Sequence, residues 1–119
     1  MRGLAAALVV IGMLAAAGSA HASTAVGLGM REWSIAVYRP TVTAGTVRFL
    51  VTNRGEDAHN LRVRGPHGYR SAVSADAAPG GGRITLRTHL TRPGRYTLLC
   101  VKPGHAQLGM RAVIRVRSG

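Results

Sequence analysis

Short runs of alternating apolar and polar residues, each closed by turn residues, are the feature that most constrains this fold. The clearest is 111–117, where Ala112, Ile114 and Val116 alternate with arginines and Val113. Period-two alternation of this kind is typical of strands with one buried face. About seven short strands separated by turns predict an all-β sandwich of two sheets, without an amphipathic helix. The strands placed by this pattern are 32–38, 46–52, 60–64, 83–90, 95–101 and 111–117.

Two segments carry more specific expectations. In 32–38, Trp33, Ile35 and Val37 fall on one side of the strand and are predicted to face the core. Residues 71–82 are small and polar and end in Pro79 and three glycines, which favours an irregular crossover. One helical turn is expected within it, around 74–77.

The N-terminus predicts the compartment. Arg2 precedes an apolar stretch from Leu4 to Ala17, and Ala20-His21-Ala22 fits the small-x-small rule for signal cleavage. We therefore expect residues 1–22 to be a secretory signal peptide and 23–119 to be one exported domain, periplasmic or extracellular. An uncleaved anchor is the alternative, although the apolar run is shorter than the roughly 20 residues that span a bilayer.

The expected mature chain is strongly basic. Residues 23–119 hold fifteen Lys and Arg against four Asp and Glu, a formal net charge of +11. Such a field favours anionic partners, and we expect a redox protein with an acidic docking surface or an anionic membrane surface. Nucleic acid is not expected, because aromatic residues are few, no nucleic-acid motif is present and the arginines are scattered singly along strands. We expect a monomer.

Cys100, His105 and Met110 lie five residues apart near the C-terminus. A thiolate, an imidazole and a thioether are soft donors that suit copper better than calcium, magnesium or a dedicated zinc cage. A His₂Cys copper site with a weak axial methionine needs a second histidine, and His59 is the best candidate because a predicted strand leaves directly from it. The alternatives are a core thiol or an intermolecular disulfide partner at Cys100, a core methionine and an ordinary surface histidine. A single cysteine cannot form an internal disulfide.

This pattern resembles the cupredoxins, the blue-copper family that includes plastocyanin, azurin, pseudoazurin and rusticyanin. The family joins its last two strands by a Cys-x₂₋₄-His-x₃₋₄-Met loop, and this chain has Cys-x₄-His-x₄-Met over 100–110. His59-Asn60 matches the asparagine that often follows the family's first histidine. The turn from Pro93 to Tyr96 is similar to the family's Pro-Gly-x-Tyr approach to the cysteine strand.

The resemblance implies a cupredoxin-like Greek-key sandwich holding one type I copper. It makes His59, Cys100 and His105 the equatorial ligands and Met110 the axial one. Asn60 would tie the two ligand loops together and help stabilise the thiolate. His105 would reach the surface within an apolar patch through which electrons pass. His67 and His89 are not expected to bind copper.

Two functions follow as expectations. The first is a small exported electron carrier that cycles between Cu(II) and Cu(I) without substrate chemistry. The alternative is a copper-binding protein for copper buffering or delivery. An enzyme is not expected, because multicopper oxidases and copper nitrite reductases use additional His-x-His copper motifs that this chain lacks.

Overall fold

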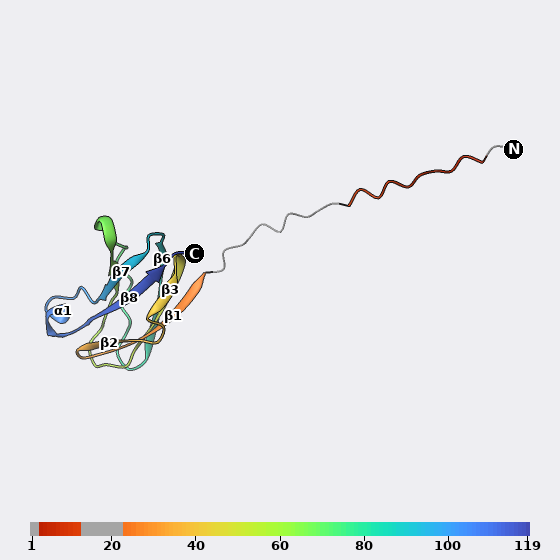
Figure 1. The fold of residues 1–119 in the computed structure, drawn as a ribbon. Coiled ribbons are helices and arrows are strands. Elements are labelled where there is room, and N and C mark those ends of the chain that lie inside the picture. The colour runs from red at the N-terminus through yellow and green to blue at the C-terminus, as the bar shows by residue number, and fades with distance from the viewer. Residues whose placement is uncertain (1–2, 13–22) are drawn as a thin grey trace.

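The computed structural model describes residues 3–12 and 23–119, and the latter form a β-sandwich of two four-stranded sheets (Figure 1). The first sheet has the strand order β2-β1-β4-β6 and the second β3-β8-β7-β5. The predicted all-β Greek-key class is confirmed, with eight strands rather than about seven. They are β1 (Thr24–Arg31), β2 (Ser34–Val37), β3 (Thr41–Thr43), β4 (Gly45–Asn53), β5 (Arg62–Arg64), β6 (Gly82–Leu90), β7 (Gly94–Leu99) and β8 (Arg111–Arg117).

The two sheets are mixed in strand direction. In the first, β4 pairs antiparallel with β6 over nine residues and parallel with β1. In the second, β7 pairs antiparallel with both β5 and β8, while β3 pairs parallel with β8. The only helical pieces in the described residues are η1 (Pro66–Gly68) and the single turn α1 (His105–Leu108), and α1 lies between β7 and β8 at one end of the sandwich (Figure 1).

The core lies between the sheets and follows the predicted alternation. Phe49 of β4 faces the interior together with Tyr96 and Leu98 of β7 and Ile114 of β8, and each is at most 1% exposed. Cys100 continues the inward row of β7 one residue beyond the strand. The row that buries the core therefore also aims the thiol at one end of the sandwich.

Strand β1 was missed by the sequence reading, and two glycines explain why. Gly27 and Gly29 weaken the strand pattern because glycine has low β propensity. In the structure these glycines leave space for the Tyr38 side chain, because a Cβ at Gly27 would lie 3.0 Å from it and a Cβ at Gly29 would lie 2.6 Å from it. The aromatic ring therefore packs directly over the strand backbone at positions that look unfavourable in the sequence.

Two local predictions were wrong. The predicted strand at 32–38 begins only at Ser34, because Glu32 and Trp33 form the turn between β1 and β2, and Trp33 is 37% exposed instead of facing the core. No helical turn forms at 74–77, because the backbone of Ala77 pairs with that of His59.

The predicted signal peptide falls partly outside the described residues. Residues 3–12 are exposed and carry no helix or strand, and the proposed cleavage site at Ala20-His21-Ala22 lies in the part that is not described. Within 3–12 and 23–119, no helix has both the length and the apolar character needed to cross a membrane.

Candidate metal centre

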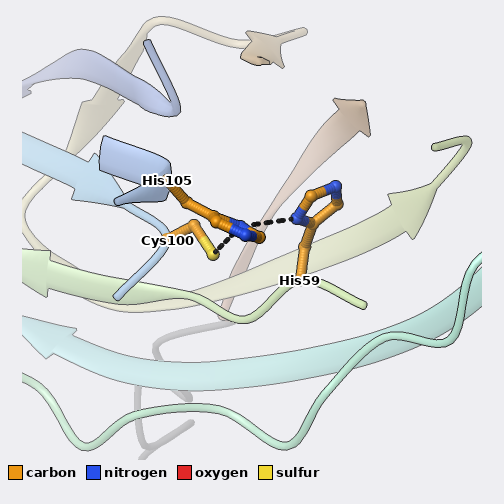
Figure 2. Close-up of side chains that lie close together, drawn as sticks. All are labelled: His59, Cys100 and His105. Carbon is orange, nitrogen blue, oxygen red and sulfur yellow. Dashed lines mark hydrogen bonds between the residues drawn. The ribbon is translucent and has the colours of Figure 1, made fainter. Parts of the chain in front are cut away.

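His59, Cys100 and His105 converge at the end of the sandwich that carries α1 (Figure 2). Cys100 follows β7 directly, and His105 is the first residue of α1. His59 lies beyond the loop that follows β4, and its N–H and C=O both pair with Ala77, at 3.3 and 2.8 Å. Each side chain thus projects from backbone that is tied into the sandwich.

The donor atoms are spaced for a single ion. The Nδ1 atoms of His59 and His105 are 3.2 Å apart, Cys100 Sγ is 3.5 Å from His105 Nδ1, and all three donors lie within 4.8 Å of one another. Two nitrogens that each bind a first-row ion at about 2.0 Å lie about 3.2–3.5 Å apart when the angle between them at the ion is about 105–120°. A nitrogen and a thiolate sulfur bound at the same angles lie about 3.4–3.7 Å apart. The cluster therefore suits one copper ion by both its geometry and its soft donor set.

The cluster is buried in the protein except at one edge, where it reaches solvent. His59 and Cys100 are fully buried, whereas His105 is partly exposed. The Trp33 ring meets His105 edge-on, with ring centroids 4.8 Å apart. His105 is thus the ligand nearest to solvent, and Trp33 covers part of it.

The loop between Cys100 and Met110 is closed by its own backbone. Met110 N–H donates to His105 O at 3.1 Å, and Cys100 N–H donates to Met110 O at 3.2 Å. Gly104 and Gly109 have φ values of 81° and 127°, which favour glycine, and a Cβ at Gly109 would lie 2.6 Å from Trp33 O. Met110 is fully buried at the base of this loop. Its role as axial ligand stays a prediction.

Asn60 connects the two ligand loops through its side chain. Its Oδ1 accepts a hydrogen bond from Val101 N–H at 2.9 Å, and the Cys100 thiol lies 3.5 Å from the same oxygen. The adjacent His59 and Cys100 segments are therefore locked together next to the sulfur. The role of Asn60 in stabilising the thiolate stays a prediction.

Asn53 is a buried site residue that the sequence reading missed. It ends β4, its Nδ2 donates to Asp57 O and Ala77 O at 2.8 and 2.9 Å, and its Oδ1 accepts from Gly55 N–H at 2.9 Å. One amide group thus folds the loop that leads to His59. The signal available in the sequence was an asparagine directly after the predicted strand 46–52.

Glu32 is the second residue missed. Its Oε1 lies 2.8 Å from Nε2 of His59, the ring nitrogen opposite the one that faces the cluster. The N–H groups of Asp57 and Glu56 donate to the same carboxylate, and these bonds lower the pKa of Glu32 to about 2. Glu32 is therefore ionised at neutral pH.

The two remaining histidines of the described domain lie elsewhere. His67 belongs to η1, and the exposed His89 of β6 lies 3.0 Å from the Thr46 hydroxyl. Neither belongs to the cluster of potential ligands.

Solved structures with the same architecture include copper proteins. Reduced auracyanin from Roseiflexus castenholzii matches with a TM-score of 0.64 at 22% identity, covering 81% of this chain and 98% of that one. The chain has a cupredoxin fold. Auracyanin A from Chloroflexus aurantiacus, described as a "blue" copper protein, gives a TM-score of 0.61 at 20% identity, with coverage of 81% and 100%. Rusticyanin from Thiobacillus ferrooxidans gives 0.59 at 22% identity, with coverage of 80% and 77%.

These identities establish a likeness of fold. No protein-family model matches the chain, and the search of curated proteins gave no match.

Proposed function

We propose that this protein is an exported, single-domain blue-copper electron carrier that holds one type I copper and performs no substrate chemistry. The observation that carries the proposal is the cluster of one thiol and two imidazole donors, all within 4.8 Å, on a rigid sandwich. When bound there, copper would supply a one-electron Cu(II)/Cu(I) couple. His59, Cys100 and His105 would be the equatorial ligands and Met110 the axial one.

The fixed backbone around the cluster suits electron transfer. His59 is paired with Ala77, and the Cys100 loop is closed by two backbone hydrogen bonds of its own. Asn60 joins the two loops at 2.9 Å. Because the ligands are held by the fold, a change of oxidation state would require little rearrangement of the protein.

His105 is the proposed entry and exit point for electrons. It is the one partly exposed member of the cluster. The exposed Trp33 ring packs edge-on against it, and the exposed residues Pro103 and Leu108 belong to the same loop as His105. Leu108 is 59% exposed. An uncharged surface of this kind allows a partner to approach the ligand closely without desolvating charged groups.

The proposed partner is an acidic protein, because the outer face of the second sheet is basic. Alternate residues of β8 and β7 place Arg95 and Arg115 directly opposite one another, both exposed. A hollow beside Cys100 is lined by Arg64, Lys102 and Arg111. Carboxylates of a partner docked there would lie next to the ligand loop, and such attraction speeds association at low salt.

Export is proposed from the N-terminal pattern, with cleavage after Ala22 releasing residues 23–119. Mass spectrometry of the protein recovered from the medium or periplasm tests this part. A mature mass beginning at Ser23 supports it, and an intact N-terminus on exported protein refutes cleavage.

Visible spectroscopy of the Cu(II)-loaded protein tests the copper assignment. An intense thiolate-to-copper charge-transfer band is expected in the wild type, and Cys100→Ser should abolish it. His67→Gln is the matched control, because it removes an exposed histidine outside the cluster, and it should keep the band. A colourless wild type, or colour that survives Cys100→Ser, would refute the proposal. Reversible voltammetry supports a carrier, whereas rapid transfer of copper to an acceptor would favour delivery.

A further inference from the structure

Glu32 binds the outer nitrogen of a proposed copper ligand. The residue lies in the turn between β1 and β2, 27 positions before His59, and its Oε1 is 2.8 Å from His59 Nε2. The other ring nitrogen, Nδ1, faces His105 and the rest of the cluster. The imidazole of His59 thus bridges a carboxylate on one side and the metal position on the other.

The carboxylate determines which nitrogen of His59 carries the proton. An ionised glutamate can only accept hydrogen bonds, so Nε2 must be the N–H donor at this distance. In the neutral ring Nδ1 then keeps its lone pair, which is the state that binds a metal. Glu32 therefore prepares His59 as a ligand before any ion arrives.

Glu32 is itself held in place independently of the metal. Its Oε1 also accepts from Asp57 N–H at 2.8 Å, and Glu56 N–H lies 3.1 and 3.0 Å from its two oxygens. Gly55 leaves room for it, since a Cβ there would lie 2.5 Å from both carboxylate oxygens. The turn, the loop and the ligand are thus joined through one charged group.

We infer that Glu32 is a positioning residue of the metal centre: it fixes the tautomer of His59 and brings a negative charge next to the ligand ring. The inference rests on the proposed function for its effect on copper. A hydrogen-bonded carboxylate makes imidazole a stronger donor, and its charge favours Cu(II) over Cu(I). The geometry places that charge roughly 6–7 Å from the ion, within one Debye length at physiological salt.

Two substitutions separate the charge from the hydrogen bond. Glu32→Gln keeps an oxygen that can accept from His59 and Asp57 but removes the charge, whereas Glu32→Ala removes both. Glu56→Gln is the matched control, because it removes an equal charge three residues from His59. The Glu56 side chain makes no hydrogen bond or ion pair within residues 23–119.

The first measurement is the Cu(II)/Cu(I) equilibrium of each loaded variant against a common redox mediator. Glu32→Gln should shift this equilibrium toward Cu(I) by about tenfold, or about 59 mV for a one-electron couple. Glu56→Gln should shift it by less than about threefold, because its charge is exposed and screened. Equal shifts in the two variants would overturn the electrostatic role.

The second measurement needs no copper. Nitrogen NMR of the metal-free protein should show His59 protonated at Nε2 in the wild type and Glu32→Gln, and a mixture of tautomers in Glu32→Ala. An unchanged Nε2–H tautomer in Glu32→Ala would overturn the positioning role. If the wild type failed to bind copper, the proposed function would fall, while this readout would still decide whether Glu32 fixes His59.

Discussion

Replacing Asn53 with alanine should destabilise the protein and loosen the metal site together. Asn53 is fully buried, and its amide makes three hydrogen bonds to loop backbone. The substitution leaves the buried Gly55 N–H without a partner, at about 1–3 kcal/mol, and removes two further bonds of about 0.5–1.5 kcal/mol each. The two carbonyls that lose the Asn53 amide are not left buried without a partner, because Ala77 O still accepts from His59 N–H and Asp57 is exposed. The expected loss in the free energy of unfolding is therefore about 3 kcal/mol.

Urea unfolding of the metal-free protein measures this loss. With a slope of about 1.5 kcal/mol/M, typical of small domains, the midpoint should fall by about 2 M at an unchanged slope. Copper affinity, measured by competition with a chelator, should also fall, because Asn53 shapes the loop that leads to His59.

Thr88→Val provides the matched control for the Asn53 substitution. Thr88 is also buried, and its hydroxyl donates to Val47 O at 2.9 Å. Val47 lies six residues from Asn53 along β4, roughly 20 Å away at the rise of a strand. The control should cost about 1 kcal/mol and leave copper affinity unchanged. A loss below 1 kcal/mol in Asn53→Ala, or equal weakening of copper binding in both variants, would refute the reasoning.

Three further predictions test other parts of the structure. The pKa of Glu32 is lowered from 4.5 to about 2, so its ionised form stabilises the fold above about pH 4.5, and this contribution is lost as the pH falls toward 2. The Tm of the metal-free protein should therefore drop between these pH values. The drop should be smaller in Glu32→Gln, which lacks the titrating group. Trp33→Ala should uncover one edge of His105 and speed copper loss to a chelator several-fold, with Trp33→Phe close to wild type in stopped-flow measurements. Tyr96→Phe removes the hydroxyl that donates to Arg92 O at 2.7 Å and should cost about 1 kcal/mol in urea unfolding without altering the copper spectrum.

Much of the fold could be predicted because its strands bury one face. The range 111–117 was predicted to the residue, and 83–90 and 46–52 to within one residue at each end. Strand β1 escaped because Gly27 and Gly29 interrupt its pattern, and the ring that covers them belongs to Tyr38 of a neighbouring segment. Local propensity contains no information about such a tertiary contact.

In the site too, residues close together in the sequence could be predicted, whereas a contact between distant residues could not. The spacing within 100–110 placed Cys100 and His105 in one loop, and the structure brings both next to His59. Glu32 could not be found in this way, because it contacts the site across 27 residues and lies one position from an apolar residue that mimics a continuing strand. Only the tertiary contact between the β1–β2 turn and the loop that holds His59 makes its carboxylate part of the site.

The negative side chains of the domain gather near the proposed metal ligands, whereas the outer faces of the sheets carry positive charge. All four Asp and Glu side chains of residues 23–119 lie in or against the segments that hold the proposed metal ligands. Glu32 contacts His59, Glu56 and Asp57 belong to the loop before His59, and Asp76 pairs with Lys102 at 2.5 Å. The charged residues on the outer faces of the sheets are all arginines. Some are directly opposed, such as Arg48 and Arg87, and like charges in this position disfavour folding.

Salt should therefore affect the rate of reaction with an acidic partner and the redox potential differently. The Debye length falls from about 30 Å at 0.01 M to about 10 Å at 0.1 M, so salt screens the exposed arginines from a distant partner. It acts little on Glu32, which is separated from the metal position by a single imidazole ring. Between these salt concentrations, the rate of electron transfer with an acidic partner should fall at least tenfold, while the Cu(II)/Cu(I) equilibrium should change by less than about threefold. A potential that follows salt as steeply as the rate would show that the arginines, and not the carboxylate beside His59, set the electrostatics of the site.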